Sequence, residues 1–232
     1  MRFREQQQMK LMQTAMNKED TPLSSQPPSL HLQLLSLKQD IEKLLTINQR
    51  AERTKIKKTQ LLPKWLPIAE QYLADDKVFK NEVFAWCIVW LFDVGQYDQA
   101  LAWTDIAITQ GQETPGNIKR DFAHFAADQI IEWAEQISPT GQSVEPYFSL
   151  VFEKIKTQWK LNEQLAAKYY KFAGLALLRS KNGKVDATKL EDIEVLTQAD
   201  ALLAVAEELH HKIQVKTQRN TIAARIRKLQ TA

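Results

Sequence analysis

The chain has 232 residues and a formal net charge of +3, and its six tryptophans, nine phenylalanines and five tyrosines can fill one sizeable core or two small ones. Its single cysteine, Cys87, excludes an intramolecular disulfide and suits a reducing cytoplasm. The longest apolar run, residues 83–92, is about half as long as a membrane span requires, and the N-terminal residues lack the apolar stretch of a signal peptide. We therefore expect an intracellular protein that does not contact membranes.

The first 29 residues predict a region that precedes the folded protein. Residues 3–18 are rich in glutamine and predict a short helix. Residues 20–29 contain three prolines and three serines and predict a linker.

Apolar residues then recur at alternating intervals of four and three, which predicts a helix spanning residues 30–60. The recurring positions form a heptad seam, the pattern by which helices associate: Leu30, Leu34, Leu37, Ile41 and Leu44. Asn48 and Ala51 extend this seam, and a buried asparagine there can fix register or oligomeric state. The seam either joins several copies of the chain or packs against the protein's own core.

A basic run occupies the end of this predicted helix. Five cations stand within nine residues against one acid, Glu52: Arg50, Arg53, Lys55, Lys57 and Lys58. Their mutual repulsion weakens an isolated helix unless a polyanion neutralises it. The run is therefore either a DNA-binding segment or an ordinary solvated helix end.

Residues 61–232 predict a globular body built from helices. The motif LLPKWLP opens it at residues 61–67, where two prolines are expected to end the basic helix and Trp65 to anchor the next element. An apolar helix over residues 78–94 should end at Gly95, and Asp98 is placed to cap the next helix. Further helices are expected near residues 118–136, 144–158, 162–180, 187–210 and 215–229.

The expected fold class is all-α, with a long N-terminal basic and heptad helix followed by a tetratricopeptide-like helical-hairpin array. The sequence GQYDQAL at residues 95–101 is typical of the turn in such a hairpin, although no constant repeat period is present. Four tryptophans are the expected core anchors: Trp65, Trp86, Trp90 and Trp103. The predicted regions are residues 1–29, 30–60 and 61–232.

Charge is distributed unevenly along the chain. Residues 1–60 carry a net charge of +5, residues 61–210 carry −8, and residues 211–232 carry +6. This partition favours anion contacts at the two ends, with the acidic body held away from a polyanion. The second basic segment, with an apolar stripe of Ile222, Ile226 and Leu229, could equally dock onto a partner helix.

Two sequence motifs resemble the small terminase subunit of cos-packaging temperate tailed phages, often labelled the terminase endonuclease subunit or M-protein family. They are LLPKWLP at residues 61–67 and WCIVWLFDVGQYDQAL at residues 86–101. The helix end ITQG at residues 108–111 and the turn TPG at residues 114–116 fit the same pattern. The resemblance is clear over residues 40–136 and fades to a shared KFAGL helix at residues 171–175. These hallmarks are structural rather than catalytic.

The resemblance implies a phage or prophage protein of the host cytoplasm, which binds the packaging (cos) site on concatemeric viral double-stranded DNA. It would direct cleavage and loading of that DNA with the large terminase subunit. Small terminase subunits generally assemble as rings, so a homo-oligomer is also implied. The first 60 residues lack the helix-turn-helix pattern that many small terminases carry, so contacts to the DNA backbone are better supported than base readout. The candidate DNA contacts are Arg50, Arg53, Lys55, Lys57, Lys58 and Lys64, with a second set of Arg219, Arg225, Arg227 and Lys228.

The sequence shows no catalytic constellation, although the family's endonuclease label implies a part in DNA cleavage. Residues 111–118 have the outline of a phosphate loop but lack its lysine, so the packaging motor is expected in another polypeptide. Asp75 to Lys77 provide a nuclease-like Asp-x-Lys spacing, and Glu207 with His210 a di-iron-like Glu-x-x-His spacing, but neither has the further ligands required. We predict no catalytic residue, metal or cofactor.

Two alternatives stay open. The chain could be a metal-dependent DNA endonuclease whose carboxylates meet only in the assembled oligomer. It could also be a tetratricopeptide-like adaptor that binds only protein.

Overall fold

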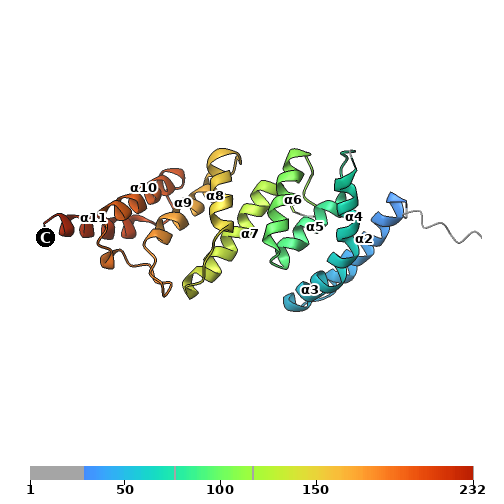
Figure 1. Cartoon of the computed structure of the whole chain (residues 1–232), viewed down its shortest axis with the longest axis horizontal. Helices are drawn as coiled ribbons and strands as arrows, with labels where there is room; N and C mark the ends of the chain where they lie inside the picture. The colour runs from blue at the N-terminus through green and yellow to red at the C-terminus, as the bar shows by residue number, and fades with distance from the viewer. Residues whose placement is uncertain (1–28, 76, 117, 232) are drawn as a thin grey trace, which may run out of the picture. The chain divides into compact units, whose positions relative to one another are not determined.

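The computed structural model describes residues 29–75, 77–116 and 118–231. Regular secondary structure in this part of the chain is helical, and extended pairing there is limited to one antiparallel bridge between Arg179 and Val185. The predicted all-α class is therefore confirmed (Figure 1). The helix expected at residues 3–18, and most of the linker expected at residues 20–29, lie outside the described residues.

The chain divides into two compact units, residues 1–45 and residues 46–232. The described part of the first unit is one helix, α2, spanning Leu30–Leu45. This helix is leucine-rich, and some of its leucines are exposed to solvent: Leu30, Leu32, Leu35 and Leu45.

The prediction of one long helix over residues 30–60 is wrong. Helix α2 ends at Leu45, residues 47–49 have no regular structure, and α3 begins at Arg50. Asn48 therefore lies between two helices and does not continue the heptad seam. The residues after α2 have low intrinsic helix propensity, namely Thr46, Ile47 and Asn48. The spacing of apolar residues carries no information on this propensity.

The basic run and the LLPKWLP motif share one uninterrupted helical segment. Helix α3 (Arg50–Ile56) continues into a π-helical turn (Lys57–Leu61) and then into α4 (Leu62–Ala74). The expectation that two prolines end the helix is therefore wrong, because Pro63 lies in the first turn of α4 and Pro67 lies inside it.

The π turn offers a physical reason for this continuity. In an α-helix, the ring of Pro63 would clash with the carbonyl of Thr59, four residues earlier. Here the Leu62 N–H donates instead to the carbonyl of Lys57, five residues earlier. The wider turn adds one residue directly before the proline and so relieves the clash.

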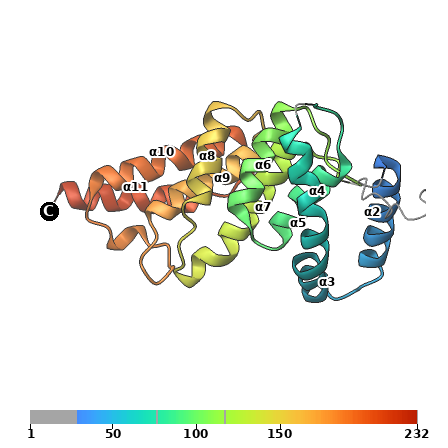
Figure 2. The same cartoon turned by 45° about the vertical axis from the view of Figure 1, so that its right-hand side comes forward.

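The core of the N-terminal half of the second unit is built around α5 (Glu82–Asp93). Asn81 caps this helix by accepting the Phe84 N–H at 3.0 Å, and most of its residues are buried. Helix α5 packs against α4 and against α6 (Tyr97–Thr109), as Figures 1 and 2 show. Gly95, with a φ of +76°, makes the turn between α5 and α6.

Three of the four predicted tryptophan anchors are buried, namely Trp65, Trp90 and Trp103, whereas Trp86 is half-buried. The prediction that Asp98 caps α6 is wrong. The N-cap of that helix is Gln96, whose side chain makes no capping hydrogen bond.

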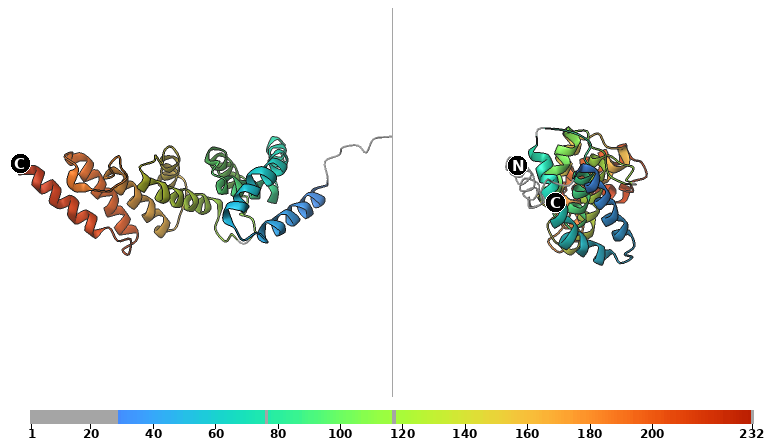
Figure 3. Two further views of the ribbon diagram at one scale, coloured as in Figure 1. Left: turned by 90° about the horizontal axis from the view of Figure 1, so that it is seen from below. Right: turned by 90° about the vertical axis from the view of Figure 1, so that its right-hand side faces the viewer.

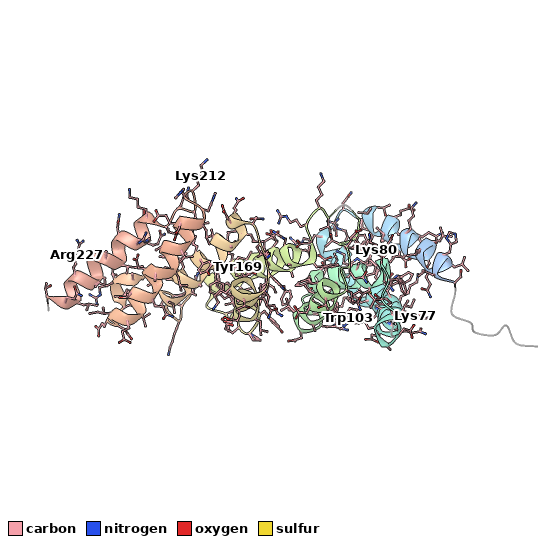
Figure 4. All side chains as sticks on the ribbon, turned by 90° about the horizontal axis from the view of Figure 1, so that it is seen from above. Lys77, Lys80, Trp103, Tyr169, Lys212 and Arg227 are labelled. Atoms are coloured by element: carbon pink, nitrogen blue, oxygen red, sulfur yellow. The ribbon has the colours of Figure 1, made fainter. Side chains whose placement is uncertain are left out.

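Helices α7 (Phe122–Ile137), α8 (Tyr147–Thr157) and α9 (Glu163–Leu177) form the next part of the core. Tyr169 of α9 donates its hydroxyl hydrogen to the Ala127 carbonyl at 2.8 Å, and its ring stacks on Phe148 with centroids 5.4 Å apart. Burial raises the pKa of Tyr169 well above its ordinary value. Figure 4 shows Tyr169 among these helices.

The C-terminal part consists of α10 (Ile193–Leu209) and α11 (Lys216–Gln230), preceded by a short 3-10 turn at Ala187–Lys189. Helix α10 packs against both α9 and α11 (Figures 2 and 3). Their shared apolar cluster contains Leu178, Ala187, Leu196, Ala199, Leu203, Val215 and Ile222.

From α4 to α11, helices pack mainly on their neighbours in the sequence, as expected for successive helical hairpins. Their likeness to tetratricopeptide hairpins stays a prediction. Within the described ranges, the helices are too short or too polar to cross a membrane.

Candidate nucleic-acid interface

Three cations of the basic run are exposed. Arg50, Lys55 and Lys58 point to solvent, and Arg53 is half-buried. Arg50 with Arg53, and Lys55 with Lys58, are each three residues apart, which places each pair on one side of the helix. Between residues 50 and 61 the sequence contains one acid, Glu52. The first half of this segment therefore presents concentrated positive charge.

Lys57 has a different environment from its neighbours. Its ammonium donates to Asp93 Oδ2 of α5 at 2.6 Å, and the two side chains are 15% and 30% exposed. This ion pair joins the π turn to the end of α5. Lys57, although predicted as a DNA contact, therefore has a structural role within the protein.

Asp93 was not predicted from the sequence as a partner of Lys57. The two residues are separated by 36 positions, and an aspartate at the end of an apolar helix carries no local signal of a distant lysine.

Lys64 follows on α4, with its ammonium 4.7 Å from the centroid of the neighbouring Trp65 ring. This distance is within the range of a cation–π interaction. The side chain of Lys64 is exposed, whereas the indole is buried.

The second predicted set consists of two half-buried and two exposed residues. Arg219 bonds to Asp200 at 2.9 Å and to Glu207 at 2.7 Å. These hydrogen bonds raise the pKa of Arg219 and outweigh the opposing effect of burial. Arg225 donates its Nε hydrogen to the Leu190 carbonyl at 2.7 Å.

Arg227 and Lys228 are exposed in the last turn of α11, and Figure 4 labels Arg227 on this helix. The structure therefore leaves two of the four C-terminal cations on the surface. The other two hold α11 against α10 and the loop before it.

One candidate metal ligand considered from sequence, Glu207, already has a partner in the fold. Glu207 of the Glu-x-x-His pattern is bound to Arg219, and Asp75 is exposed at the C-cap of α4. Among the residues that the structure describes, three or more His, Cys, Asp or Glu side chains do not gather closely enough to hold a metal ion.

Asp121 and His124 link two helices. Asp121 caps α7 by accepting the His124 N–H, and the same carboxylate contacts His124 Nδ1 at 2.8 Å. His124 Nε2 accepts the Asn162 N–H at the start of α9, so Nδ1 carries the ring proton. Burial acts to raise the pKa of Asp121, but the hydrogen bonds from His124 outweigh it and hold that pKa below its ordinary value.

Comparison with known proteins shows which family shares the two sequence motifs at residues 61–67 and 86–101. The family model of the phage small terminase subunit matches residues 34–164, which is more than half of the chain. The chain belongs to this family. The resemblance seen in the sequence is thereby confirmed, and the matched region contains α3 to α8 entirely.

Two relatives carry the word terminase in their names. The chain is 40% identical over 182 residues to the "Probable terminase, endonuclease subunit" of Haemophilus phage HP1, and 25% identical over 153 residues to the "Terminase, endonuclease subunit" of Escherichia phage P2. The aligned regions cover 78% and 66% of this chain, and 65% and 61% of those proteins. The chain thus spans just under two thirds of the length of these terminase relatives. No solved structure matches it.

Proposed function

We propose that this protein is a small terminase subunit that binds the packaging (cos) site on concatemeric phage DNA. It presents that DNA to a large terminase subunit for cleavage and loading. The observation that carries the proposal is the exposed cationic helix, α3 with the π turn, inside a chain of the small terminase family.

The chemistry of this helix suits a DNA backbone. Arg50, Lys55 and Lys58 are exposed and close in sequence, and phosphate neutralisation by such side chains is the main source of sequence-independent affinity. If several copies assemble into a ring, each copy adds its own contacts, so that a modest affinity per helix becomes a high total affinity. Arg53 and Lys64 extend this set, and Arg227 with Lys228 form a second one.

A second candidate function is DNA hydrolysis by the chain itself. The names of the two relatives, both called endonuclease subunits, favour it. In this alternative, carboxylates from different copies would converge on a metal ion in the assembled protein.

The test compares two double variants of the full chain. Lys55→Gln/Lys58→Gln removes two exposed cations three residues apart, and Lys181→Gln/Lys184→Gln removes a matched exposed pair from a loop after α9. Fluorescence anisotropy with a cos-containing duplex should show about tenfold weaker binding for the first variant at moderate salt. The slope of log affinity against log salt should fall by about two for each engaged protomer.

Equal losses for both variants would contradict the assignment of the DNA contacts to this helix. Absence of DNA binding by the unaltered chain would support the protein-only adaptor instead. The same samples with Mg²⁺ decide between recognition and hydrolysis, because site-specific cutting by the protein alone would establish the endonuclease alternative.

A further inference from the structure

A pocket of about 250 Å³ lies away from the basic helix, where the end of α7, the following 3-10 turn (Ser138–Thr140), α9 and the loop between α10 and α11 meet. None of the predicted DNA contacts lines it. Its walls combine cationic and apolar side chains, and this combination defines the kind of ligand that it suits.

Three cations line this pocket against one carboxylate. Lys168 and Lys171 are on α9, and Arg179 follows the end of that helix. The carboxylate is that of Glu135, near the end of α7. Within the described parts of the chain, neither Lys171 nor Arg179 forms an ion pair. The pocket therefore carries positive charge that the fold does not neutralise.

The hydrogen bonds of these two cations go to neutral carbonyls. Lys171 donates to the Ile213 carbonyl at 2.8 Å, and Arg179 donates to the Gly183 carbonyl at 2.6 Å. Desolvation lowers the pKa of Arg179, as expected for a partly buried cation without an anionic partner. An anion in the pocket would supply the missing compensation.

Two residues that line the pocket each contain a buried polar atom without a hydrogen-bond partner. These atoms are Arg179 Nε and the hydroxyl oxygen of Ser138, and the Ser138 residue is only 4% exposed. A buried polar group without a partner costs free energy, so native proteins usually satisfy such groups. Both atoms belong to residues that line the same pocket.

The wall of the pocket is held in place by close packing of two loops. A Cβ atom at Gly183 would overlap the Pro139 carbonyl, and one at Gly141 would overlap the Lys181 carbonyl. Both glycines have positive φ angles, +83° and +79°. The loops therefore pack backbone against backbone, which holds Pro139 of the pocket wall in place.

We propose that this pocket binds a carboxylate of a partner peptide, in a segment where the carboxylate stands beside an apolar side chain. Lys171 and Arg179 would pair with the carboxylate, and the apolar side chain would lie against Phe172 and Leu175. A duplex suits this site less well than a peptide, because a phosphodiester brings no apolar group and a concave wall containing Glu135 would repel neighbouring phosphates. The proposal goes beyond DNA binding and does not depend on it.

The test uses phenylacetate as the probe, because it joins one carboxylate to one apolar ring. Saturation-transfer difference NMR on the full chain should show saturable binding of phenylacetate and at least about tenfold weaker binding of the neutral phenylacetamide. Inorganic phosphate serves as a third probe, and its ability to displace phenylacetate is measured in the same experiment.

Variants locate the binding site. Arg179→Gln should abolish the phenylacetate signal, and Lys168→Gln, which alters an exposed side chain, should weaken binding about threefold even if the first variant folds poorly. Lys184→Gln, an exposed lysine of the adjacent hairpin that does not line the pocket, should bind as the unaltered protein does.

Three results would overturn the proposal. The first is equal binding of phenylacetamide and phenylacetate, which indicates a purely apolar site. The second is binding of inorganic phosphate at a lower concentration than phenylacetate. The third is displacement of phenylacetate by a short DNA duplex, if Lys168→Gln abolishes this displacement. The last two would assign the pocket to phosphate or to DNA. Each leaves the proposed role of α3 unaffected.

Discussion

Lys57 and Lys58 are adjacent in the basic run but have different physical roles. Lys58 is exposed, whereas the ammonium of Lys57 is partly buried in its ion pair with Asp93. Removing one member of a partly buried pair leaves the other charge desolvated without compensation. Neutralising these two lysines should therefore have different consequences for folding.

We predict that Lys57→Gln lowers the free energy of unfolding by about 2 kcal/mol, since it leaves the Asp93 carboxylate without its cation. Urea denaturation followed by circular dichroism measures this change. Lys58→Gln is the matched control and should stay within about 0.5 kcal/mol of the unaltered chain. If both variants lose the same stability, the ion pair contributes nothing to folding.

At the scale of elements, the contact between α9 and α10 depends on a glycine inside a helix. A Cβ atom at Gly174 would lie 2.9 Å from Leu203 Cγ and 3.0 Å from the Ala199 carbonyl oxygen. The absence of a side chain lets the two helix backbones approach closely. In an unconstrained helix, alanine would instead be preferred over glycine by about 1 kcal/mol.

The sign of the effect of Gly174→Ala tests this contact. We expect a loss of about 1–3 kcal/mol in thermal or urea denaturation, because the added methyl group must push α10 away from α9. The double variant Gly174→Ala/Leu203→Ala should show a smaller total loss than the sum of the single variants. A stabilising Gly174→Ala would mean that the helices are farther apart than described.

Helices with local signals were predicted well from sequence. The end of α5 before Gly95 was predicted, although the helix starts at Glu82, after its Asn81 cap, rather than at residue 78. The helices from α7 onward lie close to their expected positions, except that α10 starts at Ile193 rather than at residue 187. The break before Arg50 was missed because the spacing of four and three residues continues across it through Asn48 and Ala51. The passage of the helix through Pro63 was missed because a π turn has no recognised sequence signal.

The candidate sites were harder to predict than the helices. Charge clustering gave Arg50, Lys55 and Lys58 as candidate DNA contacts from sequence alone. The structure leaves them exposed, and their contact with DNA stays a prediction. Charge clustering could not distinguish Lys57 from these three residues, because the partner of Lys57, Asp93, lies on another helix. The carboxylate pocket was not predicted at all, since its lining comes from segments between Glu135 and Ile213 that only the fold brings together.

At the scale of the whole chain, the region matched by the family model ends at residue 164, inside a packed part of the molecule. Tyr169 and Phe172 of α9 lie just beyond this point, and they pack on α7 and α8 through Ala127 and Phe148. The end of the matched region is therefore not a folding boundary.

We predict that a fragment of residues 1–164 loses hydrogen-exchange protection in α7, because removal of Tyr169 exposes the face of α7 that it covers. Hydrogen exchange with mass spectrometry measures this protection. A fragment of residues 1–215, which lacks only α11, serves as the control and should retain α7 protection. Full protection of α7 in the shorter fragment would show that α9 is dispensable for this part of the core.

The position of Cys87 has a practical consequence for measuring assembly. It is the only cysteine in the chain, it is fully buried, and burial together with the nearby Glu70 raises the pKa of its thiol. Thiol-reactive reagents act on the thiolate, so this side chain stays inert at neutral pH. A fluorophore can therefore be attached to a single cysteine introduced at an exposed position, without altering the native one. Energy transfer between differently labelled copies would then report subunit exchange in solution.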